Sequence, residues 1–155
     1  MRMAPTDMPF TDQDHRLMRM ALQEAEAAFE AGEVPVGAVV AANGRVLARA
    51  RNQTELLRDV TAHAELVAAA SAAQALGGKF LPGCTVYVTL EPCPMCAGAL
   101  FWFRPERIVY GAPDPKRGQS LYSPSLYHPK TVVHQGLMAE EAAGLLQEFF
   151  RLRRE

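Results

Sequence analysis

Apolar residues in the first third of the chain recur with two spacings, one typical of a helix and one typical of strands. From about residue 12 to about residue 31 the spacing is helical, and Thr11 followed by Asp14 is the pattern of a capped helix start. Two β-rich runs follow, at 36–41 and 45–50, and the Asn-Gly pair between them is the strongest short signal for a hairpin. The sequence therefore predicts a helix that packs on a sheet beginning with this hairpin.

Further along, helical and strand-like segments alternate. An alanine-rich helix is expected from residue 62 to about 76, a strand at 85–90, a helix at 94–103 and a short strand at 107–110. A last helix, about 139–153, carries its large apolar residues on one side. This alternation predicts an α/β sandwich with a partly parallel sheet, in which sites lie at the carboxyl ends of the strands.

Length and composition place the chain among globular proteins with one domain. The sequence has 155 residues, of which 49% are hydrophobic and 21% are charged. Residues 1–10 contain two prolines and are expected to form a flexible arm, so the single domain is predicted over residues 11–155. Apolar runs end well before about 18 residues and the start of the chain lacks an apolar signal core. We therefore expect no membrane association and a cytoplasmic location.

The net charge of −1 argues against a strongly basic surface over the whole molecule. Positive charge is nevertheless concentrated at Lys116-Arg117 and at the end of the chain, 151–154. Because phosphate binding depends on local patches, a local nucleic-acid contact stays possible.

The most informative chemical pattern joins His63-Ala64-Glu65 to the segment that contains Cys93 and Cys96. An imidazole and two thiolates provide three ligands of a tetrahedral zinc ion and leave the fourth position for a water, whose pKa zinc lowers to about 7. A structural zinc site would normally fill that position with a fourth protein ligand. With proline before the first cysteine, the pattern is the signature of zinc-dependent nucleobase deaminases.

Spacing also indicates how these residues work together. Cys93 and Cys96 are three apart at a predicted helix start, so their sulfurs share one face. His63 and Glu65 are two apart, which places the metal over the end of their helix rather than against its side. Glu65 is then free to act as the proton carrier. We expect it to take a proton from the attacking water, to deliver it to a ring nitrogen, and later to protonate the leaving ammonia.

Two other interpretations of the cysteines are open. A C-x-x-C pair alone could be a thioredoxin-like redox pair or half of a structural zinc site. The three remaining histidines, His15, His128 and His134, form no close-spaced partner pair that would complete a structural site. The third cysteine, Cys84, stands at a strand start and is expected to be a small buried hydrophobe.

Longer stretches of the sequence resemble the cytidine deaminase superfamily, and within it the bacterial tRNA-specific adenosine deaminases, over about residues 12–154. The stretches that carry the resemblance are 33–39, 61–65, 87–99 and 149–154. The last of these is the more discriminating, because the metal motif is common to the superfamily. The resemblance implies a three-layer α/β/α sandwich around a mixed five-stranded sheet, zinc bound by His63, Cys93 and Cys96, and a homodimer.

The resemblance also implies a reaction and a set of substrate contacts. The reaction is the conversion of adenosine to inosine at the wobble position of a tRNA anticodon loop. The contacts with the target and its neighbours are implied for Asn52, Ala64, Asp114, Lys116 and Phe150. Phe150 and Arg153 or Arg154 match the family's C-terminal helix. Structural alternatives are open: Asn52 could merely end a strand, Phe150 could belong to the core, and the terminal arginines could form a solvated helix end.

Two segments depart from the pattern of the tRNA enzymes. Residues 115–129 replace a small-residue segment, and the aromatic run 101–103 is similar to guanine deaminases of the same superfamily, although it also suits core or dimer packing. Three functions are therefore weighed: a tRNA deaminase, a deaminase of guanine or another free nucleobase, and a silent partner or RNA-binding module. The intact set of His63, Glu65, Cys93 and Cys96 argues against the last of these.

Overall fold

The computed structural model describes residues 10–154. Residues 1–9 of the expected N-terminal arm lie outside this range, whereas Phe10 packs against the core beside the first helix. In chain order the elements are α1 (Asp12–Glu30), β1 (Gly37–Ala42), β2 (Arg45–Arg51), α2 (Ala64–Ala75), β3 (Thr85–Leu90), α3 (Pro94–Phe103), β4 (Arg107–Ala112), a short 3-10 helix (Gln119–Leu121), β5 (Val132–Gln135) and α4 (Ala139–Arg154).

The five strands form one mixed sheet in the order β2-β1-β3-β4-β5. Strand β1 runs antiparallel to both β2 and β3, whereas β3, β4 and β5 are parallel. The hairpin between β1 and β2 turns at Asn43 and Gly44, whose φ angles of 52° and 78° are those of the left-handed turn that an Asn-Gly pair favours. The predicted hairpin and the expected mixed sheet are both confirmed.

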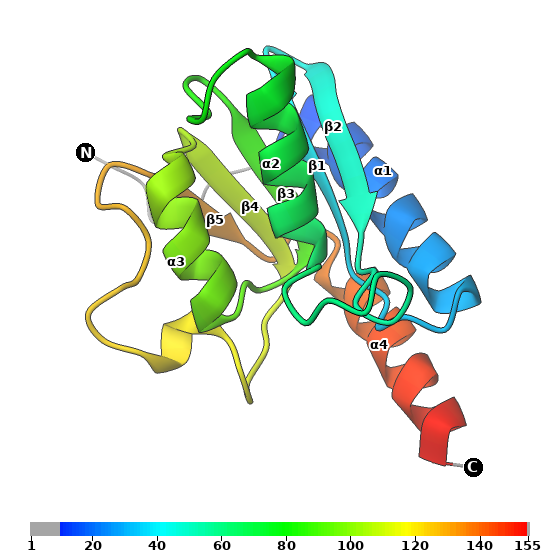
Figure 1. Ribbon diagram of the computed structural model, residues 1–155. Helices are drawn as coiled ribbons and strands as arrows, with labels where there is room; N and C mark the ends of the chain where they lie inside the picture. The colour runs from blue at the N-terminus through cyan, green and yellow to red at the C-terminus, as the bar shows by residue number, and fades with distance from the viewer. Residues whose placement is uncertain (1–9, 155) are drawn as a thin grey trace.

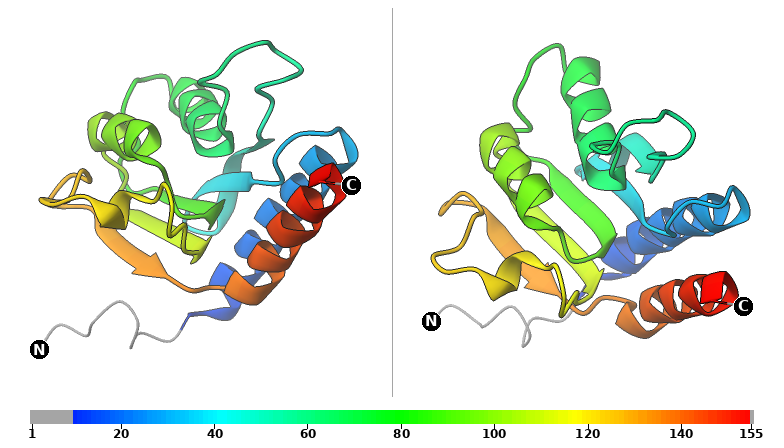
Figure 2. Two further views of the ribbon diagram at one scale, coloured as in Figure 1. Left: turned by 90° about the horizontal axis from the view of Figure 1, so that it is seen from below. Right: turned by 60° about the horizontal axis from the view of Figure 1, so that its bottom comes forward.

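Helices cover both faces of the sheet, which gives the three layers expected (Figure 1). Helices α2 and α3 lie on one face, over a core of small and β-branched residues that includes Ala68, Val88 and Ile108. Helices α1 and α4 lie side by side on the other face (Figure 2). The third cysteine, Cys84, is fully buried in the core under α2 and α3, in agreement with the prediction of a small buried hydrophobic residue.

The N-terminus of α1 has the capping box that the sequence predicted. The Thr11 hydroxyl accepts from the backbone N–H of Asp14 at 3.0 Å, and the Asp14 carboxylate accepts from the N–H of Thr11 at 3.1 Å. The same carboxylate also binds Arg107 of β4 at 2.8 Å and Tyr87 of β3 at 2.6 Å. This buried cluster joins α1 to two central strands, a link that the sequence did not predict.

The start of α2 and the strand β5 depart from the prediction. Helix α2 begins at Ala64 rather than residue 62, because Ala62 closes a turn with Asp59 and His63 adopts an extended N-cap conformation. Strand β5 was expected from the resemblance but not located in the sequence. Within residues 10–154, no helix is long and apolar enough to cross a membrane.

The topology gathers several loops beyond the carboxyl ends of the parallel strands β3 and β4. Strand β1 starts at this end of the sheet and β2 ends there, because β1 runs antiparallel to both β3 and β2. Chemically active side chains on these loops are therefore close in space although they are far apart in the sequence.

Candidate active site and metal centre

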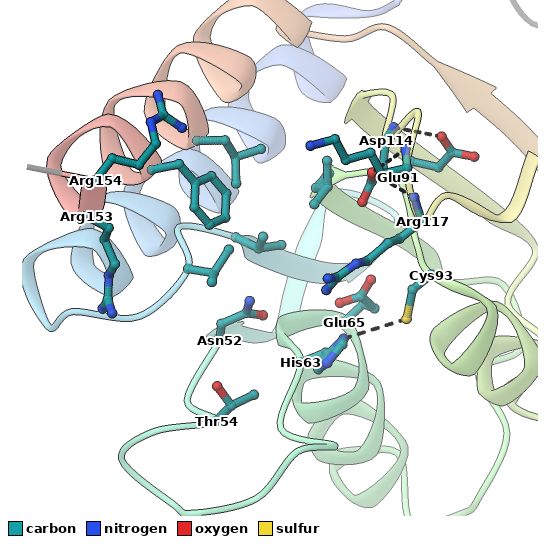
Figure 3. Close-up of a pocket in the computed structure, with 16 residues that line it drawn as sticks. Asn52, Thr54, His63, Glu65, Glu91, Cys93, Asp114, Arg117, Arg153 and Arg154 are labelled. Carbon is teal, nitrogen blue, oxygen red and sulfur yellow. Dashed lines mark hydrogen bonds between the residues drawn. The ribbon is translucent and has the colours of Figure 1, made fainter.

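The three predicted metal ligands meet at the N-termini of α2 and α3. His63 is the N-cap of α2, Cys93 is the N-cap of α3, and Cys96 lies one turn further along α3. The Nδ1 atom of His63 is 3.8 Å from Sγ of Cys93 (Figure 3). The same atom is 3.3 Å from Sγ of Cys96. All three candidate donor atoms lie within 4.8 Å of one another.

This spacing fits zinc. A tetrahedral ion with Zn–S bonds of about 2.3 Å and Zn–N bonds of about 2.0 Å holds its nitrogen and sulfur ligands about 3.5 Å apart, between the two observed separations. Among residues 10–154, no fourth histidine, cysteine or acidic side chain joins this group. The donor set is therefore that of a catalytic zinc site, which keeps one position open.

The charges of the ligands are coupled. The hydrogen bond with Cys96, followed by that with His63, lowers the pKa of Cys93 to about 4, so Cys93 is a thiolate at neutral pH. The pKa of Cys96 is raised by its hydrogen bond with Cys93 and by its burial. The pKa of His63 is also raised, because His63 contacts Cys93. A bound divalent cation takes the place of the protons that these groups share, so metal uptake releases protons.

Glu65 lies beside this group on the first turn of α2. Its side chain is only 4% exposed, and burial raises its pKa to about 7. A carboxyl group with that pKa exchanges protons readily at neutral pH, which suits a general acid and base.

A cleft of about 650 Å³ opens above these residues. Its floor contains His63, Glu65 and Cys93, and its walls come from the segment before β1, the loop after β2, the loop after β4 and the last turns of α4. A ligand can therefore enter the cleft from the end of the sheet at which β3 and β4 terminate.

Comparison with known proteins identifies the family. Residues 11–112 match the family described as the cytidine and deoxycytidylate deaminase zinc-binding region. The chain belongs to this deaminase family. Its fold, its ligand set and its metal therefore agree with the expectations from the sequence.

Curated relatives and solved structures indicate which kinds of deaminase the chain is similar to. A tRNA-specific adenosine deaminase of Agrobacterium fabrum is 47% identical over 142 residues, which cover 88% of this chain and 93% of the relative. A solved structure from studies of A-to-I editing by tRNA:A34 deaminases at the wobble position is 46% identical, with a TM-score of 0.79, covering 84% of this chain and 99% of that chain. A guanine deaminase from Bacillus subtilis is 27% identical with a TM-score of 0.63, covering 94% and 96%.

Asn52 and Ala64 are directly linked in the deaminase. The Oδ1 atom of Asn52 accepts the backbone N–H of Ala64 at 2.8 Å, at the start of α2. The amide NH₂ of Asn52 is then the group left to donate into the cleft that this residue lines. Ala64 itself is fully buried, and its N–H is committed to Asn52.

Asp114 and Lys116, for which the resemblance implies contacts with neighbouring nucleotides, both line the cleft. The Oδ1 atom of Asp114 accepts the backbone N–H groups of Lys116 at 3.1 Å and Arg117 at 3.0 Å. Asp114 therefore shapes the turn that presents two cationic side chains.

Two buried carboxylates hold opposite walls of the cleft, and the sequence did not single out either of them. Glu91 accepts the backbone N–H groups of Asp114 at 2.9 Å and Ser120 at 2.8 Å. Glu33 accepts those of Glu55 at 3.0 Å and Leu56 at 2.8 Å. Both side chains are about as buried as the core, 3% and 2% exposed, so these N–H groups take the place of the water that their oxygens would otherwise bind.

Helix α4 supplies the remaining wall. Phe149 is buried edge-to-face against Phe29, whereas Phe150 is 44% exposed and lines the cleft with Arg153 and Arg154. The side of α4 predicted as apolar therefore divides between core and cleft.

The two departing segments lie differently from the cleft. The aromatic residues 101–103 do not line it, and Trp102 is 67% exposed on α3. The 115–129 loop is partly buried: Gln119 accepts from Ser125 and Leu126, and Tyr127 packs in the core. Only the start of this loop, at Lys116 and Arg117, reaches the cleft.

Proposed function

We infer that this deaminase is a zinc-dependent hydrolase that converts adenosine to inosine at the wobble position of a tRNA anticodon loop. The observation that carries this conclusion is the convergence in one cleft of an open-sided zinc ligand set, a buried acid and a rim of basic side chains. Relatives named as tRNA-specific adenosine deaminases, similar over almost their full length, support the same substrate.

In this proposal His63, Cys93 and Cys96 hold the zinc. When bound, zinc supplies Lewis-acid chemistry that makes water available as hydroxide near neutral pH. Because both helices point their N-termini at the ligands, their partial positive charges stabilise the two thiolates.

Glu65 moves the protons. As the oxygen of water attacks C6 of adenine, Glu65 takes the proton released and delivers it to the adjacent ring nitrogen. The C6–N bond then breaks, and Glu65 transfers the second proton of the water to the departing amine, which leaves as ammonia. One water is consumed and one carbonyl is formed, so Glu65 ends in its starting state.

The substrate contacts are proposed at the positions that the resemblance implies. Asn52 donates its amide NH₂ to the target nucleoside, and Ala64 fixes Asn52 through its backbone N–H. Asp114, Lys116 and Phe150 lie around the opening, where they suit contacts with the neighbouring nucleotides. An anticodon loop is already partly single-stranded, so extruding one base costs at most a few kcal/mol.

We also propose a cytoplasmic homodimer with one deaminase domain at residues 11–155. The single sheet supports the one domain, and a tRNA substrate supports the location. Exposed apolar side chains support a subunit contact; they include Met95 and Trp102 on α3, Val60 in the loop before α2 and Tyr122 in the loop after β4. Sedimentation equilibrium of the chain tests the dimer.

The zinc-loaded protein, incubated with an adenosine-bearing anticodon stem-loop and separately with guanine, tests the function. Inosine is read by sequencing and ammonia by a coupled assay. We expect inosine from the stem-loop, with activity that falls steeply as salt rises. Ammonia from guanine with an untouched stem-loop would instead make this a free-base enzyme.

A further inference from the structure

One cationic side chain in the cleft is not explained by the zinc site or by the implied substrate contacts. Arg117 lies at the start of the loop that departs from the tRNA enzymes, and its side chain points from that loop into the cleft (Figure 3). Throughout residues 10–154, no carboxylate forms an ion pair with Arg117. Its charge is therefore available to a ligand.

The backbone of Arg117 is fixed on both sides. Its N–H donates to Oδ1 of Asp114 at 3.0 Å, and the N–H of Gly118 closes the same turn on the carbonyl of Asp114 at 2.8 Å. A Cβ at Gly118 would stand 2.3 Å from Oε1 of Glu91, so only glycine allows this close approach. The loop thus presents Arg117 on a rigid support rather than on a free surface.

The acidic groups nearest this loop are already engaged. Both carboxylate oxygens of Glu91, and Oδ1 of Asp114, accept backbone N–H groups of the loop itself. The other charged side chains at the opening are basic and belong to Lys116, Arg153 and Arg154. Four basic side chains, those of Lys116, Arg117, Arg153 and Arg154, therefore gather at this opening although the whole chain has a net charge of −1.

The size of the cleft indicates what approaches this charge. At about 650 Å³ it lies in the range that holds drug-sized ligands, so it exceeds what a bare base requires. A guanidinium group binds phosphate through paired N–H groups and also pairs with its negative charge, whereas a neutral base offers acceptor atoms without that charge.

We propose that Arg117 is a specificity-determining residue that binds a phosphate adjacent to the target nucleotide. It favours a nucleotide within a strand over a free base or nucleoside. This inference rests on the proposed function and assigns the departing loop to RNA binding.

A double-mutant cycle between the protein and the substrate tests this contact. The zinc-loaded protein and its Arg117→Ala variant are assayed on the adenosine stem-loop. Each is also assayed on stem-loops with an uncharged methylphosphonate at either phosphate that flanks the target. The variant should lower kcat/KM about 10- to 100-fold, since it removes a charge-assisted hydrogen bond, and should leave kcat nearly unchanged. Arg117→Lys should recover part of this loss.

At one of the two positions the methylphosphonate should lower kcat/KM for the unchanged chain and have little further effect on Arg117→Ala. The salt dependence of stem-loop binding should also weaken by about one unit in log–log slope. Arg19→Ala, on the exposed surface of α1, is the matched control and should change neither quantity.

Additive losses at both phosphates, or the same kcat/KM for Arg117→Ala as for the protein without the substitution, would overturn the inference about Arg117. Inosine formation by the protein without the substitution would still uphold the proposed function. If the unchanged chain forms no inosine, the function itself fails, and the inference fails with it.

Discussion

Glu65 is an acid that the fold keeps out of water, and its burial sets what it can do. At 4% exposure its charged form loses hydration, which raises the pKa to about 7. His63, two residues earlier, faces the same cleft from the N-cap, because the extended backbone there turns its ring toward the sulfurs. In the proposed reaction, one short segment therefore supplies both a metal ligand and a proton carrier.

The first prediction concerns this acid. Glu65→Ala should lower turnover of the stem-loop by at least about 100-fold, because proton transfer contributes that much or more. Zinc content should stay close to one ion per chain, since the three ligands remain. Inosine formation and zinc by atomic absorption are measured together. Retained turnover, or loss of the zinc, would contradict the assigned role.

At this scale the sequence shows some residues clearly and others not at all. His63, Glu65, Cys93 and Cys96 were predictable because local spacing fixes their chemistry. Glu33 and Glu91 were not, because a lone acid gives no sign of which loop will donate N–H groups to it. In the sequence Arg117 could be recognised only as part of a local concentration of positive charge. The direction of its side chain depends on the turn that Asp114 and Glu91 hold by hydrogen bonds.

At the scale of elements, two loops in the walls of the cleft are held by carboxylates. These carboxylates accept backbone N–H groups of the loops, as a carbonyl oxygen does in a helix or a sheet. Glu91 uses one oxygen for Asp114 and the other for Ser120, so both oxygens are needed. Because a buried N–H without an acceptor costs about 1–3 kcal/mol, the loop should be sensitive to a change of a single atom.

Glu91→Gln is therefore predicted to loosen the loop after β4. It should raise KM for the stem-loop about 10-fold, leave zinc content unchanged, and lower the protection of loop amides in hydrogen exchange. Glu140→Gln, on the exposed side of α4, is the control. Unchanged KM and unchanged exchange would show that the loop does not depend on this carboxylate.

The ion pair between α1 and β4 predicts a dependence of stability on pH. Burial alone would raise the pKa of Asp14, but hydrogen bonds from Arg107 and Tyr87 outweigh it and hold this pKa below its ordinary 3.8. A depressed folded pKa gives stability that is present above pH 3.8 and is lost as pH falls below it.

Chemical unfolding between pH 7 and pH 2 measures this effect. The unchanged chain should lose stability steeply below about pH 4. Asp14→Asn should be less stable at pH 7 by about 3 kcal/mol, because it leaves Arg107 without its partner, and should show a flatter profile. Parallel profiles for the two proteins would contradict this assignment.

Most elements were predictable because their patterns are long. Strands β1 to β4, the hairpin turn and all four helices follow from periodicity and turn residues within two positions. Strand β5 has four residues, Val132–Gln135, with no repeating pattern of its own, and it forms only because β4 offers a parallel edge. The start of α2 was placed too early because alanine favours helix, whereas a turn at residues 59–62 competes for those residues.

At the scale of the whole molecule, the metal joins segments that are about thirty residues apart. His63 begins one helix and Cys93 begins another, so a zinc ion bound to both stabilises the packing of that face. The resemblance, and not the periodicity, carried the substrate class, because the metal motif is shared by deaminases of different bases.

Removal of zinc should therefore lower stability as well as activity. Dialysis against a chelator is predicted to lower the melting temperature by roughly 10 °C, the effect expected when free zinc is about a thousandfold above its dissociation constant. Calorimetry before and after addition of zinc measures the shift. An unchanged melting temperature in protein shown to be free of zinc would contradict a metal held by two helices.

The central claim is that the cleft selects one adenosine in a folded RNA. An unmodified tRNA pool, treated with the zinc-loaded protein and with Glu65→Ala and then sequenced for inosine at every adenosine, tests it most directly. We predict inosine at the wobble position alone, and only with the unchanged chain. Inosine scattered over many adenosines, or none at the wobble position while guanine is consumed, would contradict the account.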